Sequence, residues 1–390
     1  MVDQIDATVA AKPRPATKRW RIPRLRFSLR TFLVLICLIG ALLGLAAHRI
    51  EKGKQRWAKI AELQKLGVGV GFTEDYRQWT PDVIGNMNWW QSWREADRAQ
   101  NLSVVMFGQE SPAPRAFELI RDFPGIAIVH LDGQEVDDRL MAELVRHRNI
   151  VHLDLQRSQI TDEGLARLLE LPNLNSLALP PGTTDAGLAH VAQLTQLRRL
   201  VARNTKITDA GLKNFVGRRG VDFLDLSNTP VTDEGVSHLV GMKSLIQLDL
   251  SGTRVTGACG EHLSGLAQLT RVELNQTQFD DAGLENISKL PLYRLSLAGT
   301  KITDTGLRHL HGAELCDIDL SNTAVSGDGL RHLADCFELE SIKLNGTLID
   351  DADVPVLLQF TVPTQLQLKD TLLTPAGESL FWQGKLQNGP

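Results

Sequence analysis

The chain has 390 residues, 43% of them hydrophobic, with four cysteines and a formal net charge of −4 at pH 7. This length is sufficient for a large core, and so few cysteines argue against a disulfide scaffold. Residues 1–56 hold 12 basic and 3 acidic residues, which leaves 30 basic and 43 acidic residues in the remainder. The remainder therefore has a charge of about −13, so no nucleic-acid partner is expected.

The amino-terminal part of the sequence predicts a membrane anchor. Residues 1–30 are basic, and we expect them to form a disordered cytoplasmic tail. Residues 31–48 are predicted to be a transmembrane helix, because they contain an apolar run without a charge, at the short limit for a spanning segment. Eight basic residues precede the run and six follow it. This bias favours a single-pass protein of the cytoplasmic membrane, with the bulk of the chain on the extracytoplasmic side.

Two features of the apolar run have alternative interpretations. Gly44, Leu45 and Ala46 offer small residues for cleavage, so a secreted protein with a cleaved signal peptide competes with the anchor. The long basic lead and the helical pattern that follows favour the anchor. Gly40 and Gly44 form a G-x-x-x-G step that would support a weak dimer, although small residues are common in membrane helices.

Residues 49–100 are predicted to form a juxtamembrane helix and an amino-terminal cap. Their glycine-rich stretch 67–71 lacks the Lys-Ser/Thr ending of a phosphate loop, which favours a cap strand or turn. We interpret their tryptophans as cap core rather than as a ligand box; these are Trp57, Trp79, Trp89, Trp90 and Trp93.

Residues 101–385 repeat a single pattern that contains an L-x-L core. Successive copies of its second apolar position are 23 or 24 residues apart, at Leu131, Leu155, Leu179, Ala202, Leu226, Leu250, Leu274, Leu297, Leu320, Leu344 and Leu368. A period this regular predicts a solenoid, whose units bury their apolar faces against one another. Phe381 and Trp382 are expected to close its carboxyl end, and residues 386–390 form a tail.

Each repeat is predicted to be a strand, a turn and a capped helix. The stretch FLDLS alternates between apolar and polar residues, which is typical of a short strand. A Thr, Ser or Asp then stands where a helix would begin, and Asp usually follows it. The first of these positions is occupied by Thr161, Thr184, Thr208, Thr232, Thr256, Asp280, Thr303, Ser326, Asp350 and Thr374. The fold class is therefore an α/β solenoid with a curved parallel sheet inside and helices outside.

The pattern L-x-x-L-x-L-x-x-T-x-I-T-D-x-G-L resembles the leucine-rich-repeat family, over about eleven to twelve units. Its I-T-D-x-G-L half is similar to the cysteine-containing and GALA-like bacterial subtype. Thr replaces the Asn or Cys expected after the strand, and the units are shorter than usual for that subtype. Relatives of this subtype often follow an F-box in ubiquitin-ligase adaptors, but no F-box precedes these repeats.

The concave face is the surface where binding is favoured. Its central row is predicted to be His130, Asp154, Ala178, Val201, Asp225, Asp249, Glu273, Ser296, Asp319, Lys343 and Gln367. Neighbouring strands lie about 4.8 Å apart, so three acidic side chains would lie in line and point to solvent. The candidate binding residues are Asp225, Asp249, Glu273, Asp319, Arg271 and Arg294. A solvated face of mixed charge is the alternative to a recognition face for a basic partner.

No motif indicates catalysis, a cofactor or a metal site. Five histidines share one helical position, His190, His238, His262, His309 and His332. Joint ligation is strained, because neighbouring helices lie about 10 Å apart and a metal–nitrogen bond is about 2.1 Å. Cys259, Cys316 and Cys336 fit core positions, with a Cys316–Cys336 bridge as the alternative.

The sequence thus predicts a membrane-tethered protein that binds or scaffolds a protein partner through its concave face and is not an enzyme. The identity of the partner cannot be inferred, since leucine-rich repeats bind through individual surface residues. A substrate-recognition adaptor of a ubiquitin-ligase-like type and a secreted repeat protein are the alternative functions.

Overall fold

The computed structural model describes residues 29–72, 102–107, 113–131, 136–360 and 365–388. Its internal contacts divide the chain into two compact units, Met1–Glu51 and Lys52–Pro390. Four of the five tryptophans that we predict to be cap core lie outside the described residues, at Trp79, Trp89, Trp90 and Trp93.

The first unit contains the start of α1 (Leu29–Lys65), a helix that runs without interruption into the second unit. By length and composition, α1 is the one helix in the described ranges that could cross a membrane, although a signal sequence near the amino terminus meets the same criteria. None of its apolar window is buried, so this segment is not part of a protein core.

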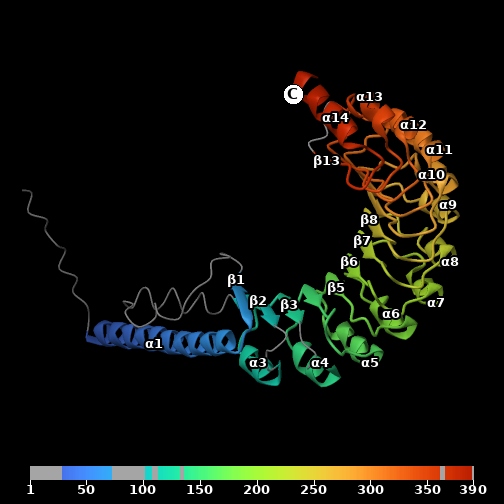
Figure 1. The fold of residues 1–390 in the computed structure, drawn as a ribbon. Helices are drawn as coiled ribbons and strands as arrows, with labels where there is room; N and C mark the ends of the chain where they lie inside the picture. Colours follow the sequence, from blue (N-terminus) through green and yellow to red (C-terminus); the bar gives the residue numbers. More distant parts are fainter. Residues whose placement is uncertain (1–28, 73–101, 108–112, 132–135, 361–364, 389–390) are drawn as a thin grey trace, which may run out of the picture. The chain divides into compact units, whose positions relative to one another are not determined.

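The second unit is built on one 13-stranded sheet whose strands follow chain order (Figure 1). β1 pairs antiparallel with β2, and every later pair is parallel. The strands are β1 (Gly69–Phe72), β2 (Leu102–Phe107), β3 (Ile128–Leu131), β4 (His152–Asp154), β5 (Ser176–Ala178), β6 (Arg199–Val201), β7 (Phe223–Asp225), β8 (Gln247–Asp249), β9 (Arg271–Glu273), β10 (Arg294–Ser296), β11 (Asp317–Asp319), β12 (Ser341–Lys343) and β13 (Gln365–Gln367).

Short helices connect successive strands and cover the outer side of the arc, while the strands line its inner side (Figure 1). They are α3 (Ala113–Ile120), α4 (Asp138–Leu144), α5 (Asp162–Leu165), α6 (Asp185–Val191), α7 (Asp209–Leu212), α8 (Asp233–Ser237), α9 (Cys259–Leu263), α10 (Asp281–Ile287), α11 (Asp304–Leu307), α12 (Gly327–Leu330), α13 (Val354–Leu357) and α14 (Pro375–Asn388). The parallel-sheet solenoid predicted from the repeat is confirmed.

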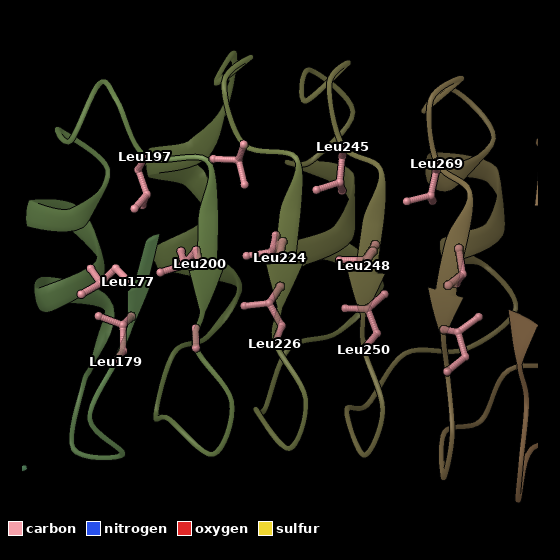
Figure 2. Packing of buried hydrophobic residues seen from close by; sticks show 14 of the residues in the cluster. Leu177, Leu179, Leu197, Leu200, Leu224, Leu226, Leu245, Leu248, Leu250 and Leu269 are labelled. Atoms are coloured by element: carbon pink, nitrogen blue, oxygen red, sulfur yellow. The ribbon is translucent and has the colours of Figure 1, made fainter. Parts of the chain in front are cut away.

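The core is a stack of leucines that each repeat contributes at the same positions. Leu224 and Leu226 of one repeat lie beside Leu248 and Leu250 of the next, and all four are fully buried (Figure 2). Because each unit is only one strand and one short helix thick, its apolar face is covered by its neighbours and not by itself.

The hydrogen bond predicted for a helix cap is present at all ten positions, although Thr256 does not directly precede its helix. Each side chain accepts a hydrogen bond from a backbone N–H two or three residues ahead, as Thr232 Oγ does from Glu234 N at 3.3 Å. Helix α9 begins only at Cys259, yet Thr256 still accepts from Ala258 N at 3.2 Å. These bonds satisfy amides that a helix start would otherwise leave unpaired.

The aspartate after each cap connects one repeat to the next. Asp209 Oδ1 accepts from Thr232 N at 2.8 Å and its Oδ2 accepts from Thr232 Oγ at 2.7 Å. The same pair of bonds recurs at eight junctions in the described residues: Asp138–Thr161, Asp162–Thr184, Asp185–Thr208, Asp209–Thr232, Asp233–Thr256, Asp281–Thr303, Asp304–Ser326 and Asp351–Thr374. We call this series the aspartate ladder.

The aspartate ladder also explains the glycine in T-D-x-G-L. A Cβ on Gly235 would lie 2.3 Å from Asp209 Oδ1, so the carboxylate occupies the space that any side chain would need. At two junctions the arrangement is reversed, because a glycine stands in the ladder position: Gly257 before the cap Asp280, and Gly327 before the cap Asp350. A Cβ on Gly327 would lie 1.9 Å from Asp353 Oδ1 of the following repeat. A Cβ on Gly257 would lie 1.9 Å from Asp280 Oδ1, so the following repeat supplies the carboxylate there.

The threonine found in place of the expected Asn or Cys acts within its own repeat. Thr229 Oγ donates to Leu226 O at 2.6 Å, and equivalent bonds recur in the other repeats. The residue before it has a positive φ, as Asn228 does at 54°. Asn and Gly tolerate this conformation best, which accounts for their presence in the turn.

The two ends of the solenoid are closed differently. At the amino end Trp57, Ile60 and Leu63 of α1 are buried, and the Trp57 and Phe72 rings lie 5.7 Å apart, so this part of α1 packs with β1 at the first edge of the sheet. At the carboxyl end Phe381 is 2% exposed, but Trp382 is 63% exposed. The prediction that Trp382 helps to close this end is wrong.

Candidate functional site

The sheet register aligns the predicted concave row without a slip. From β3 to β13, each residue of the row is paired with the next, including Asp225 with Asp249 and Asp249 with Glu273. Each residue of the row has the same separation in sequence from the buried leucines of its strand. A shift of one residue in the strand pairing would move every side chain to the other face of the sheet, so the row stays aligned.

Asp225, Asp249 and Glu273 form an acidic row on β7, β8 and β9. In the part of the chain that the structure describes, none of these carboxylates has a basic nitrogen within 4.0 Å. Burial raises the pKa of Asp249, and Asp225 raises it further. Burial also raises the pKa of Glu273, with Asp249 and Asp225 adding to the effect. The row therefore retains unfavourable electrostatic energy in the free protein.

Not every member of the acidic row points to solvent as the sequence suggested. Asp225 is only 7% exposed, and its Oδ1 accepts from Ser227 N at 2.9 Å and from Ser227 Oγ at 2.6 Å. Asp249 Oδ1 accepts from Ser251 N at 2.8 Å in the same way. The sequence D-L-S thus closes a turn at the end of the strand, so these aspartates have a structural role as well as a charge.

Basic side chains lie next to the acidic row. Arg271 is paired with Gln247 and Arg294 in the register of the sheet, and Arg294 Nε lies 3.2 Å from Asp317 Oδ2. Arg199 Cζ lies 3.3 Å from the centroid of the Phe223 ring, so its guanidinium reaches over β7. Among the described residues, neither Arg199 nor Arg271 forms an ion pair.

Asp319, another candidate residue, is separated from the acidic row by one strand. Ser296 lies between Glu273 and Asp319 in the register. Asp319 Oδ2 lies 3.4 Å from Lys343 Nζ, and its Oδ1 accepts from Ser321 N at 3.0 Å. Its charge is therefore balanced within the protein.

A second polar cluster on the inner face was not recognised in the sequence. His130 Nδ1 lies 3.5 Å from Asp154 Oδ2, the His130 and His152 rings are 5.0 Å apart, and His152 Nδ1 lies 2.8 Å from Ser176 Oγ. A hollow of about 540 Å³ adjoins His130, Asp154 and Met106. The sequence could have predicted this cluster, because His152 stands two residues before Asp154 in the same strand and therefore points to the same face of the sheet.

The remaining candidate groups are the helical histidines and the cysteines. In the described ranges no group of three or more His, Cys, Asp or Glu could hold a metal ion. The five helical histidines are each partly buried. All four cysteines are free, and Cys259, Cys316 and Cys336 are buried, as expected for core residues.

Comparisons with known proteins support the repeat assignment. A family model described as Leucine Rich repeat matches residues 146–169. No curated protein sequence matches the chain. Among solved structures, the chain is similar to an internalin (inlF) from Listeria monocytogenes, with 19% identity, a TM-score of 0.52 and coverage of 72% of this chain and 84% of that chain.

Two further structures are similar over part of the chain. Internalin C2 (inlC2) from Listeria monocytogenes has 24% identity and a TM-score of 0.38, covering 54% of this chain and 83% of that chain. The plant peptide hormone receptor RGFR1, in complex with RGF2, has 16% identity and a TM-score of 0.41, covering 67% of this chain and 47% of that chain. The family model thus matches one repeat of this chain, and the first internalin shares its fold.

Proposed function

We propose that the chain is a membrane-tethered leucine-rich-repeat protein that binds a protein partner through its concave face and carries out no catalysis. The observation that supports binding is the acidic row, in which three carboxylates on consecutive strands form no ion pair with a described basic residue. A partner that brings Lys or Arg to Asp225, Asp249 and Glu273 would relieve their repulsion. The T-D-x-G-L half of the repeat favours the cysteine-containing or GALA-like bacterial subtype.

Membrane tethering is supported by the continuity of α1. The helix continues through Ala46 and Ala47, where a signal peptide would be cleaved. Because proteases cut preferentially in exposed segments without regular structure, this continuity favours an uncleaved anchor. The same helix supplies Trp57 and Ile60 to the cap. We propose the domain boundaries 1–30, 31–48, 49–100, 101–385 and 386–390, with the repeats on the extracytoplasmic side. A weak dimer through Gly40 and Gly44 is part of this proposal.

The binding proposal is tested with a basic probe. Full-length protein in detergent micelles is titrated with a fluorescent lysine octapeptide at low and at physiological salt. The unaltered protein should bind the probe, and its affinity should fall as salt rises because Asp249 and Glu273 are partly exposed. The variant Asp225→Asn, Asp249→Asn, Glu273→Gln should lose at least about tenfold in affinity, a free-energy change of about 1.4 kcal/mol.

The matched control places three substitutions on the convex side, at His262→Gln, His309→Gln and His332→Gln. Asn at position 225 keeps an oxygen that can accept from Ser227, so the strand-end turn is retained. Equal affinities for the two triple variants would make the acidic row a solvated face and would contradict the proposal.

The ubiquitin-ligase-like adaptor and the secreted protein are distinguished by location. Repeats that face the cytoplasm would favour the adaptor. A soluble product that begins near residue 47 would favour the secreted form.

A further inference from the structure

The acidic row is accompanied by a parallel line of positive charge. We call Asp225, Asp249 and Glu273 the anionic track, and Arg199, Arg271 and Arg294 the cationic track. The anionic track crosses β7, β8 and β9. The cationic track reaches from β7 to β10, because the Arg199 guanidinium lies over Phe223 of β7 and the other two arginines belong to β9 and β10.

The spacing of the tracks follows from strand geometry. Arg271 and Glu273 are two residues apart on β9, so their Cα atoms are separated by about 6.6 Å along the strand. Within the described residues, no ion pair joins a member of one track to a member of the other. Arg294 is paired with Asp317, and Asp225 is buried against Ser227. Arg199 and Arg271 of one track, and Asp249 and Glu273 of the other, therefore remain available to a third group that lies between them.

Two uncharged side chains lie in the same register line as Arg271 and Arg294. Phe223 and Gln247 occupy the first outward position of β7 and β8, in the line of the cationic track. Both are partly buried. Gln247 can donate to and accept from a peptide backbone, and the Phe223 ring provides an apolar surface.

An extended polypeptide fits this arrangement. In an extended chain, successive side chains point to opposite sides. A chain that runs across the strands between the tracks would direct every second side chain toward the arginines and the others toward the carboxylates. We infer that the concave face recognises an extended segment in which acidic and basic residues alternate.

This inference rests on the proposed function and adds the charge order of the partner. A folded basic surface would use the anionic track alone and would be repelled by the cationic one. An alternating segment uses both, and its own charges are balanced in the complex.

The test compares two octapeptides of identical composition, one with alternating glutamate and lysine and one with four glutamates followed by four lysines. Both are titrated into the full-length protein in detergent micelles. The alternating peptide should bind at least about tenfold more tightly. Equal affinities would overturn the inference. They would leave the proposed function intact if the lysine octapeptide still binds through the acidic row.

A single substitution separates the two tracks. Arg271→Gln should weaken the alternating peptide at least about threefold, because it removes a cation that the glutamates contact, and should leave the lysine octapeptide unchanged or more tightly bound. Weakening of both peptides to the same extent would overturn the inference. Lys343→Gln is the matched control on the same face, since Lys343 is already paired with Asp319, and it should change neither affinity.

Discussion

The reversed junction between Gly257 and Asp280 predicts that the aspartate ladder can be moved by two substitutions. At the Asp209–Thr232 junction, Asp209→Gly removes two hydrogen bonds to a carboxylate, at 2.8 and 2.7 Å. Each such bond contributes about 1.5–3 kcal/mol, and Asp209 is only partly buried, so we expect a loss of about 2–4 kcal/mol. Thr232→Asp alone places a second carboxylate against the first and should cost about 2 kcal/mol.

The double variant Asp209→Gly, Thr232→Asp recreates the arrangement seen at Gly257 and Asp280. The new aspartate caps α8 as well as threonine does, and the glycine leaves room for its carboxylate. The loss of unfolding free energy in the double variant should therefore be about 2–3 kcal/mol smaller than the sum of the losses in the two single variants.

The assay is urea denaturation of the four proteins of this cycle, followed by fluorescence, with hydrogen exchange of the α8 amides as a local measure. Long repeat arrays can unfold in more than one step, so the exchange data confirm that the change lies at this junction. If the losses from the two single substitutions simply add in the double variant, the carboxylate is not shared between repeats and the reasoning fails.

Three further outcomes are expected. Leu226→Ala should lower the free energy of unfolding by about 3–5 kcal/mol because it leaves a cavity in the core, and Thr232→Ala should lower it by about 1–2 kcal/mol because it removes a helix cap. If denaturation ranked the two variants in the reverse order, the assignment of strand and cap would be contradicted. Burial raises the folded-state pKa of Asp249 and Glu273, so their ionisation destabilises the fold as pH rises. The double variant Asp249→Asn, Glu273→Gln should therefore be more stable than the unaltered protein at pH 7 and lose that advantage near pH 4. An equal difference in stability at both pH values would refute this. Protease added to intact spheroplasts should degrade the repeats, and protected repeats would contradict the extracytoplasmic orientation.

The sequence was sufficient to predict the features that depend on one repeat alone. The Leu224 and Leu226 spacing predicts the strand, Thr232 predicts the cap, and a constant period carries both through the chain. The row that contains Asp225 and Asp249 follows from the same period, because the register cannot slip without exposing the leucines.

The features that depend on two repeats could not be predicted. Asp209 suggests a helix-dipole residue in the sequence, and only its neighbour in space shows that it binds Thr232 and excludes a side chain at Gly235. The burial of Asp225 was not predicted either, although its bonds to Ser227 lie within one repeat. Trp382 lies on α14, after the last strand of the described sheet, and its side chain is 63% exposed.

The location of the partner on the concave face is tested most directly by crosslinking in intact cells. A photoreactive amino acid is placed either at Gln247, which is paired with Arg271 on the concave face, or at His262 on the convex side. The account predicts a protein adduct from position 247 that weakens when Asp225, Asp249 and Glu273 are neutralised, and none from position 262. An adduct from position 262 alone, or one from position 247 that is unaffected by neutralisation, would contradict it.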